Sequence, residues 1–361
     1  MGIGKTLNNI NKLAVKYIFF IVLLSACHYQ PTQQGQQYTD GKLSKLYNLT
    51  YPQLGRPVNI DSYLEQVKLI EQYSPQLFQK NKVIYDGINQ WIIRGLTTNQ
   101  LNLVGLNSYQ LQGQDKWGNV LLTGYYTPIM KARRKPQAQY HYPLYAKPIN
   151  FSKQLPSRLE IYEGALDGQK LEIAYTDSLI DNFIMEVQGS GYIDFEDGFP
   201  PIFFSYNGKN GHPYKSIGRL LIEQGEIDRH KISIQAIKAW AEKQDEQVVK
   251  NLLIKNASAV FFEPQGNALV SGSTGVPLIA QASVASDQTI VPAGSVLLVD
   301  TPLLDDKGVY RGQRELRLMI ALDIGGAIRR QHLDMYQGIG EQAGNLAGYY
   351  NHYGRVWLIT P

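Results

Sequence analysis

The stretch from residue 321 to residue 338 reads ALDIGGAIRRQHLDMYQG, and it joins two apolar runs through a pair of glycines. Asp323 ends the first run, and Asp334 lies in the second run beside Tyr336 and Gln337. A carboxyl group among apolar residues is poorly solvated, which disfavours its anion and raises its pKa. Such a group keeps a proton near neutral pH and can act as a general acid. The pattern therefore makes Asp334 and Asp323 candidate catalytic residues.

A structural role for the two aspartates is the main alternative. Asp side chains often cap turns, and the arginines Arg329, Arg330 and Arg355 are available in the sequence as ion-pair partners. The pattern alone leaves both interpretations open.

Glu186 is a second candidate for the acid. It precedes Gln188-Gly189-Ser190-Gly191 and alternates with Met185 and Val187, so we expect it on a strand. On a strand it would either point into a site or simply face the solvent.

The N-terminus has the features of a secretion signal. Lys5, Lys12 and Lys16 precede an apolar run from Tyr17 to Leu24, which is shorter than the ~20 residues that span a bilayer as a helix. The next residues, Leu24-Ser25-Ala26-Cys27, resemble a bacterial lipobox. We expect residues 1–26 to be a signal peptide.

Cys27 is the only cysteine, so an internal disulfide is impossible and another use of its thiol is indicated. We predict that Cys27 becomes the acylated first residue of the mature protein, followed by a polar tether over residues 27–48. His28 rather than aspartate follows the cysteine, which favours the periplasmic face of the outer membrane, with outer-membrane lipid as the anchor. The alternative is a buried free cysteine behind an ordinary signal peptide.

The composition excludes several classes of protein. The chain has 361 residues with 43% hydrophobic and 18% charged residues, which suits two globular domains and argues against disorder. The formal net charge of +4 falls to +1 when the three lysines before residue 27 are removed. Nucleic-acid binding requires clustered cations that neutralise phosphates, so we expect no nucleic-acid partner. The six histidines are scattered, so we expect no metal and no cofactor.

Apolar spacing predicts four helical regions. A helix capped by Asp61 should run to Tyr73, with Pro75 ending or kinking it, and the last region should break near residues 242–245. The expected helices are 61–73, 82–94, 214–224 and 233–256.

Short β-rich runs separated by glycine and proline fill the remaining chain. Those between residues 128 and 210 predict a small β-barrel or sandwich. The expected strands are 120–126, 171–175, 183–187, 259–262, 296–299, 316–322 and 356–359.

The 24 tyrosines and several amide side chains are consistent with a sugar-binding groove, since a ring face packs on a pyranose, although tyrosines also fill β-rich cores. Gln188, Ser190 and Tyr192 are candidates for hydrogen bonds and stacking, while their flanking glycines suit a tight turn. Thr123 and Tyr126 are further groove candidates.

Four blocks of sequence, in the same order, resemble the membrane-bound lytic murein transglycosylase A family. The resemblance runs from the lipobox to Trp357. The last blocks are also similar to the wider three-aspartate barrel domain family, whose pattern falls on Asp287, Asp323 and Asp334. The blocks are Gly124–Pro128, Asp181–Met185 with Val187–Ile193, Ala282–Asp287, and Ala321–Ile328 with Asp334–Gly338.

The resemblance implies a mainly β fold with helices, in which a double-psi β-barrel domain carries an inserted smaller β-barrel domain. The barrel would comprise residues 49–127 with 259–361, and the insert residues 128–258 with its flanking helices. The glycan would lie in the groove between the two, where Asp287 and Gln337 join the substrate-binding candidates.

The resemblance further implies a lytic transglycosylase that cuts the β-1,4 bond between MurNAc and GlcNAc in peptidoglycan and leaves a 1,6-anhydro-MurNAc end. Asp334 would be the acid, and Asp323 would tune or position it. Two alternatives stay open: a module that binds peptidoglycan without cutting it, and a hydrolase that pairs Asp334 with Asp287 or Asp323. The expected partners are peptidoglycan strands and possible cell-wall synthesis or scaffold proteins.

Overall fold

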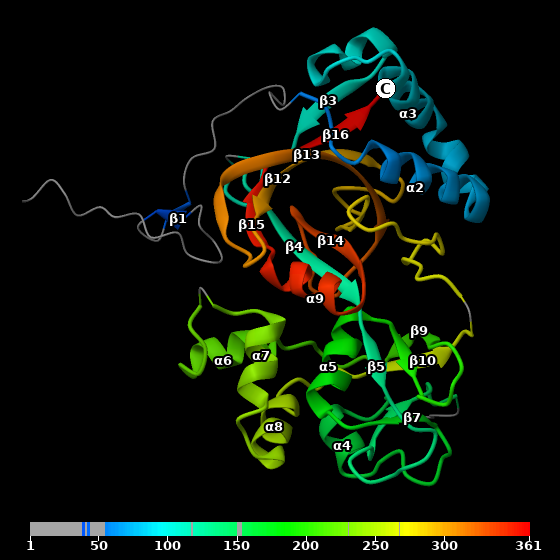
Figure 1. Ribbon diagram of the computed structural model, residues 1–361, viewed down its shortest axis with the longest axis vertical. Coiled ribbons are helices and arrows are strands. Elements are labelled where there is room, and N and C mark those ends of the chain that lie inside the picture. Colours follow the sequence, from blue (N-terminus) through cyan, green and yellow to red (C-terminus); the bar gives the residue numbers. More distant parts are fainter. Residues whose placement is uncertain are drawn as a thin grey trace, which may run out of the picture.

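The computed structural model describes residues 55–116, 118–149, 154–229, 231–266 and 268–361. It also gives the backbone of two short paired strands, β1 (Tyr38–Thr39) and β2 (Lys42–Leu43), within the expected tether. The predicted signal peptide and Cys27 lie outside the described residues. Figure 1 shows two units, a barrel-like one above and an inserted one below.

The larger unit is built on an eight-stranded sheet that curves around a common centre (Figure 1). Alternate residues of its strands point inward, as the period of two in a β-strand requires, and Val284, Leu297, Met319, Leu333 and Met335 are buried together there. In sheet order the strands are β15 (Asn351–Gly354), β4 (Val120–Thr127), β14 (His332–Ile339), β11 (Ser283–Ala285), β13 (Tyr310–Asp323), β12 (Val296–Leu304), β16 (Val356–Thr360) and β3 (Asn107–Gln110).

Two helices, α2 (Ile60–Tyr73) and α3 (Pro75–Ile93), and the 3-10 helix η2 (Thr98–Val104) cover one side of this sheet. The predicted cap Asp61 was wrong, because Asn59 is the N-cap. The Asn59 side chain instead exchanges two hydrogen bonds of 2.8 and 2.9 Å with the Leu318 backbone, which docks α2 onto β13. The start predicted at residue 82 was also wrong, because α3 begins at Pro75, where proline lacks only an N–H that has no helical partner.

The inserted unit leaves β4 and has its own sheet. The predicted small β-barrel is instead a four-stranded sheet in the order β10-β9-β8-β5, with a separate two-stranded sheet of β6 and β7. The insert was expected to end at residue 258, but β10 pairs with β9 of the insert and extends it to Pro264. The strands are β5 (Ile129–Lys131), β6 (Tyr142–Tyr145), β7 (Glu172–Thr176), β8 (Gly191–Asp194), β9 (Ile202–Lys209) and β10 (Val260–Pro264).

Helices pack on the insert sheet and form a small helical cluster beside it. The break predicted near residues 242–245 is confirmed, since α7 ends at Ala241 and α8 begins at Glu246. The helices are α4 (Arg158–Tyr162), α5 (Leu179–Gln188), α6 (Ile217–Glu223), α7 (Ile234–Ala241) and α8 (Glu246–Leu253).

The strand predicted for residues 183–187 was wrong, because this run lies inside the helix α5. Ser178 caps the helix by accepting a 3.2 Å hydrogen bond from Asp181 N, and Gly189 ends it in the left-handed conformation at φ 85°. A short apolar run fits a buried strand and a buried helix equally well. Here the capping residues decide between them.

The chain enters and leaves the insert at residues that lie side by side across its four-stranded sheet, and we call this set of paired residues a row. Ile129 pairs with Tyr192, Tyr192 pairs with Phe203, and Gln265 N donates to Phe203 O at 2.7 Å. Both connections to the barrel therefore lie at one end of the insert sheet, on its two opposite edges.

A last helix, α9 (Gly340–Tyr349), lies between the barrel sheet and the insert (Figure 1). It packs directly on β4 at Gly124, where a Cβ atom would come within 2.7 Å of Ala347 Cα. On its other side Gln235 of α7 donates to Gly344 O at 3.0 Å. Among the residues that the structure describes, no helix is long and apolar enough to cross a membrane.

Candidate active site

Two of the predicted aspartates lie on either side of one short strand. Ala285 at the end of β11 pairs with Asp323 of β13 and with Asp334 of β14. Adjacent strands are about 4.8 Å apart, so the two aspartate Cα atoms are roughly 10 Å apart. The fold therefore brings together two carboxyl groups on one part of the barrel.

Asp323 is well supplied with hydrogen-bond donors. Its Oδ1 accepts from Ser273 N at 2.8 Å and Ile324 N at 2.9 Å, and its Oδ2 accepts from the Tyr125 hydroxyl at 3.1 Å. Burial raises the pKa of Asp323, and these three donors oppose that rise by stabilising the anion.

Asp334 has much less support for a negative charge. Its Oδ1 accepts one hydrogen bond, from the Thr123 hydroxyl at 2.6 Å. Burial raises the pKa of Asp334 to about 7, the nearby Asp323 adds to the rise, and the Thr123 bond opposes it. Neither aspartate forms an ion pair with an arginine within the described ranges.

The difference between the two environments decides which carboxyl group holds a proton. Two close carboxylates resist simultaneous ionisation, and Asp323 has three donors whereas Asp334 has one. The donors therefore stabilise a negative charge on Asp323 more than on Asp334, which favours the proton on Asp334. Titratable groups whose surroundings separate their pKa values in this way mark acid and base roles in active sites.

Thr123 was predicted to contact the substrate, and the structure places its hydroxyl against Asp334. Thr123 stands opposite Asp334 in the parallel pairing of β4 and β14. Its Oγ1 also lies 2.8 Å from His332 Nε2. Burial lowers the pKa of His332 to about 4, so this ring is neutral at neutral pH.

Asp287, the third predicted aspartate, is bonded to nearby backbone and a threonine. Its Oδ1 accepts from Thr289 N and Thr289 Oγ1, at 3.1 and 2.7 Å, and its Oδ2 accepts from Arg330 N at 2.7 Å. These bonds lower the pKa of Asp287, the Thr289 hydroxyl contributing most. Asp287 is therefore an anion that fixes the loop between β13 and β14, where Arg330 has a positive φ.

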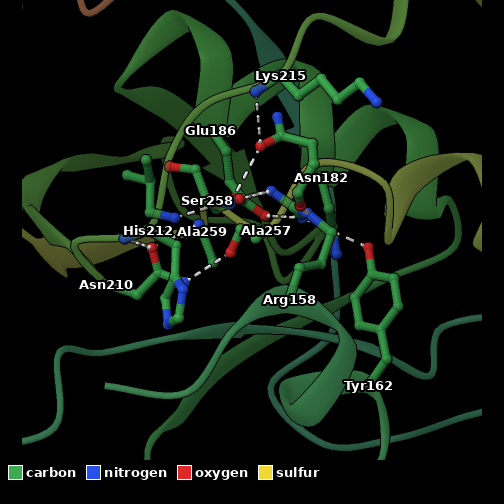
Figure 2. Close-up of polar contacts among 12 residues, drawn as sticks. Arg158, Tyr162, Asn182, Glu186, Asn210, His212, Lys215, Ala257, Ser258 and Ala259 are labelled. Carbon is green, nitrogen blue, oxygen red and sulfur yellow. Dashed lines mark hydrogen bonds and ion pairs between the residues drawn. The ribbon is translucent and has the colours of Figure 1, made fainter. Parts of the chain in front are cut away.

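Glu186, the alternative acid, is held in a buried ion pair (Figure 2). Arg158 donates to its two carboxylate oxygens at 3.0 and 2.8 Å, and Val260 N donates to Oε2 at 2.9 Å. The Arg158 side chain is 2% exposed and also donates to Asn256 O at 3.1 Å. Through these contacts Glu186 joins α4, α5 and β10, and both of its carboxylate oxygens are occupied by donors.

The insert contains a cavity of about 530 Å³ whose wall includes this ion pair. The cavity lies between α4, α5 and the β6–β7 sheet, and none of Asp287, Asp323 and Asp334 lines it. This cavity is therefore separate from the two neighbouring carboxyl groups of the barrel.

The remaining groove candidates occupy different settings. Gln188 ends α5 and accepts from Tyr126 N at 3.0 Å, while the Tyr126 ring is 8% exposed and packs against Ala343 and Ala347 of α9. Burial does not support a contact between Tyr126 and a ligand. Ser190 and Tyr192 are partly exposed where α5 meets β8.

The hydrogen bonds of Tyr192 and of Gln337, the last groove candidate, differ. Tyr192 donates to Ala268 O at 3.3 Å. Gln337 is buried in β14, and its Oε1 has no hydrogen-bond partner among the residues described. A buried acceptor without a donor is uncommon in native proteins, and here it lies three residues from Asp334.

Tyr125 and Ser273 donate to Asp323, and His332 contacts Thr123, the donor to Asp334, but none of the three was singled out from the sequence. Strand periodicity could have identified His332, because residues two apart on a strand share a face. Ser273 reaches Asp323 only through a contact across 50 residues, and nothing in its local sequence indicates this. No group of three or more His, Cys, Asp or Glu side chains in the described parts of the chain could hold a metal ion.

Comparison with family models identifies two regions. Residues 121–263 match the MltA specific insert domain, and residues 282–360 match the 3D domain. The first match covers most of β4 and the inserted unit, and the second contains all three aspartates.

Comparison with curated proteins gives relatives along nearly the whole chain. Membrane-bound lytic murein transglycosylase A of Escherichia coli (strain K12) is 49% identical over 350 residues, covering 96% of this chain and 95% of the relative. The protein of the same name from Vibrio cholerae is 43% identical over 340 residues, covering 94% and 92%.

Solved structures agree with this. E. coli MltA with bound chitohexaose has 48% identity and a TM-score of 0.83, covering 92% of this chain and 99% of that one. A second structure, of MltA from E. coli, gives a TM-score of 0.69 at 49% identity with the same coverage.

Proposed function

Because this chain belongs to the family of membrane-bound lytic murein transglycosylase A, we propose that Asp334 is the single acid and base of its reaction. The chain is a lytic murein transglycosylase, which cleaves the β-1,4 bond between MurNAc and GlcNAc in peptidoglycan and so serves cell-wall turnover. It acts as a lyase, because the MurNAc end closes into a 1,6-anhydro ring and no water is added. The observation that carries the assignment of Asp334 is its burial in the barrel across Ala285 from Asp323, which raises its pKa to about 7.

The reaction begins with the neutral Asp334. Its proton passes to the oxygen between MurNAc and GlcNAc as the bond to C1 of MurNAc breaks, and the GlcNAc hydroxyl leaves. The Asp334 carboxylate then removes the proton from the C6 hydroxyl of the same MurNAc, and that oxygen bonds to C1. Asp334 ends the turnover protonated, so protons balance. The attacking oxygen is part of the substrate, which gives it a high effective concentration.

A hydrolase with two catalytic carboxyl groups is less consistent with the site. It requires a second carboxylate that acts as base or nucleophile. Asp287 accepts three hydrogen bonds from Thr289 and Arg330, and Asp323 accepts three from Ser273, Ile324 and Tyr125. We therefore assign Asp323 to raising the pKa of Asp334 by its charge, and Asp287 to holding the loop that follows Asp323.

Substrate contacts come from the insert side and from β14. We propose Gln188, Ser190 and Tyr192, where α5 meets β8, as partners of sugar hydroxyl and amide groups. The buried Gln337 Oε1, which has no donor among the described residues, would accept from such a group. The mixed pairing of the barrel, with β11 parallel to β13 and β14 parallel to β4, supports double-psi connectivity for this domain.

We also propose that the protein is anchored by acylated Cys27 to the periplasmic face of the outer membrane. The lipobox-like sequence and the words "membrane-bound" in the names of its relatives support this. Cys27→Ser should move the protein from the membrane to the soluble fraction, and unchanged membrane fractionation would rule out this anchor. Cell-wall synthesis or scaffold proteins are proposed partners at that membrane.

The decisive experiment incubates Asp334→Ala and the unaltered protein with murein sacculi. The unaltered protein should release 1,6-anhydro-muropeptides, and the variant should release none while it still binds sacculi and unfolds at a similar temperature. Mass spectrometry distinguishes the anhydro product from a reducing MurNAc end by one water. Reducing ends would indicate the hydrolase, binding without any product would indicate a binding module, and full activity of the variant would disprove the role of Asp334.

A further inference from the structure

The Thr123 hydroxyl lies between Asp334 and His332, and each of these side chains can accept the one hydrogen bond that the hydroxyl can donate. Thr123 Oγ1 is 2.6 Å from Asp334 Oδ1 and 2.8 Å from His332 Nε2. His332 and Asp334 are two residues apart on β14, so their side chains are on the same face of the sheet. Thr123 extends from β4, which pairs with β14 in parallel along this segment. The three side chains therefore form a chain in the order His332, Thr123, Asp334.

The position of the proton on His332 follows from its other contact. The ring is neutral at neutral pH, because burial lowers its pKa to about 4, and it hydrogen-bonds to the backbone of Ala327 in a way that favours its protonated form. Such a bond is a ring N–H donating to the Ala327 carbonyl oxygen. Since Nε2 faces Thr123, we assign the ring proton to Nδ1, which leaves Nε2 with a lone pair. A neutral imidazole has one donor and one acceptor nitrogen, so here Nε2 must accept from Thr123.

The direction of the Thr123 bond then constrains Asp334. When Thr123 donates to His332, it presents only lone pairs to Asp334 Oδ1, and these match a carboxyl group that carries a proton. When Asp334 is ionised, Thr123 must turn to the carboxylate, which leaves His332 Nε2 without a donor. We propose that His332 is a positioning residue which, acting through Thr123, favours the protonated form of Asp334.

This inference rests on the proposed role of Asp334 and adds a function to the turnover. When Asp334 gives its proton to the glycosidic oxygen, the Thr123 proton turns toward the new carboxylate and the bond to His332 is lost. The carboxylate is thereby less stable than one with a free hydroxyl donor, and it removes the C6 hydroxyl proton more readily. Once Asp334 is protonated again, Thr123 donates to His332 and the starting arrangement returns.

Other groups near Asp334 come from three strands and must be considered together. Asp323 reaches the site from β13 and raises the pKa of Asp334 by its charge, and Tyr125 from β4 interacts with both carboxyl groups. His332 is the titratable neighbour on β14 itself. The only side chain seen to donate to Asp334 in the described parts of the protein is Thr123. Because His332 competes with Asp334 for the Thr123 hydroxyl, His332 directly affects whether Asp334 keeps its proton.

The test uses the full-length protein with His332→Phe, which removes the acceptor but keeps a ring of similar size. With Thr123 free to donate to the carboxylate, the pH at which kcat for sacculi falls on the alkaline side should move down by about one unit. Activity at pH 5 should change little, and activity at pH 7.5 should fall several-fold. A purely structural role predicts that the alkaline fall in kcat stays at the same pH. That result, or a fall that moves to higher pH, would overturn the proposal.

Substitutions at Thr123 show whether the effect passes through its hydroxyl. Thr123→Ser keeps the hydroxyl and should keep the alkaline limb of the unaltered protein. Thr123→Val removes the donor from Asp334 and should move the limb up. His332→Phe added to Thr123→Val should cause no further shift, because the two act through one atom. If the double variant showed an additional shift equal to that of His332→Phe alone, His332 would not act through the Thr123 hydroxyl.

Two measurements on the protein without substrate separate this inference from the proposed function. The ¹⁵N shifts of His332 should show the neutral Nδ1–H form, and the Nε2–H form would overturn the proposal even if the variants fail to fold. A ¹³C titration of the Asp334 carboxyl group in the unaltered and His332→Phe proteins should show the same downward shift in pKa without turnover. Failure of Asp334 as the catalytic acid would instead appear as cleavage by Asp334→Ala.

Discussion

Asp323 and Asp334 both pair with Ala285, from strands on opposite sides of β11. A strand of only three residues therefore sets the separation between the two carboxyl groups. Asp323 accepts three hydrogen bonds and Asp334 accepts one, so the two carboxyl groups have unequal affinities for a proton. The following predictions depend on this inequality and on the packing that maintains it.

Cleavage should decline as the pH rises through about 7. The acid form of Asp334 starts the reaction, and its pKa of about 7 means that half of the molecules lose this form at that pH. The measurement is kcat for release of anhydro-muropeptides between pH 5 and pH 9. A rate that stays level up to pH 9 would show that a different group donates the proton.

Asp334→Asn should make the fold more stable at pH 8. The folded pKa is raised to about 7, against ~3.9 for an unfolded aspartate, so stability falls as the pH rises from about 4 to about 7 while the unfolded chain ionises freely. Asn removes this cost, which for about three pKa units at about 1.4 kcal/mol each amounts to about 4 kcal/mol. Urea unfolding should show a gain at pH 8 that disappears near pH 4. A loss of stability at pH 8 would mean that the carboxylate is well accommodated.

Asp323→Asn should slow cleavage less severely than Asp334→Ala. The neutral side chain no longer repels the Asp334 anion, so the pKa of Asp334 falls and less acid is present at pH 7. We expect a loss of about tenfold at pH 7, most of it recovered at pH 5, with initial rates measured on sacculi at both values. A loss equal to that of Asp334→Ala at every pH would show that the two aspartates share the proton transfer.

Glu186→Gln should destabilise the protein but leave cleavage per folded molecule nearly unchanged. Removal of one partner leaves the Arg158 charge buried, which costs about 3–5 kcal/mol. The matched control is Glu223→Gln in the exposed pair with Arg219, where the change should be below about 1 kcal/mol. Thermal unfolding and the fraction of folded protein are measured beside activity. A folded Glu186→Gln protein without activity would restore Glu186 as the acid.

Gly124→Ala should weaken the packing of α9 on β4. The added Cβ would lie 2.7 Å from Ala347 Cα, so the helix must move, and overpacking of this kind costs about 1–3 kcal/mol. Gly326→Ala is the control, because a Cβ there meets no atom within 4 Å. Because Thr123 immediately precedes Gly124, the rate of glycan cleavage should also fall in Gly124→Ala. Equal stability of the two variants would refute the close contact.

Much of the candidate site could be predicted because its chemistry lies in short local patterns. Asp334 and Asp323 are polar residues within apolar strands, and a carboxyl group in such a run is conspicuous in the sequence itself. The break between α7 and α8 was equally visible, because polar residues interrupt the apolar spacing there.

The rest depends on contacts between segments that are distant in the chain. Glu186 is an acid candidate by sequence, and only the buried Arg158, 28 residues away, shows that it is a paired anion. The helix at residues 183–187 was missed because its capping residues Ser178 and Gly189 lie outside the apolar run that suggested a strand. The donors of Asp323 come from Tyr125 and Ser273, and no local pattern predicts that these meet.

The two attachments of the insert limit how it can move against the barrel. A body held by one peptide segment can swivel in every direction, but this one is held at Ile129 and at Gln265, on opposite edges of the same strand row. With adjacent strands about 4.8 Å apart, these two points are roughly 15 Å apart. The remaining freedom is rotation about the line that joins them, so different crystal forms of this protein should be related by a single axis along that row.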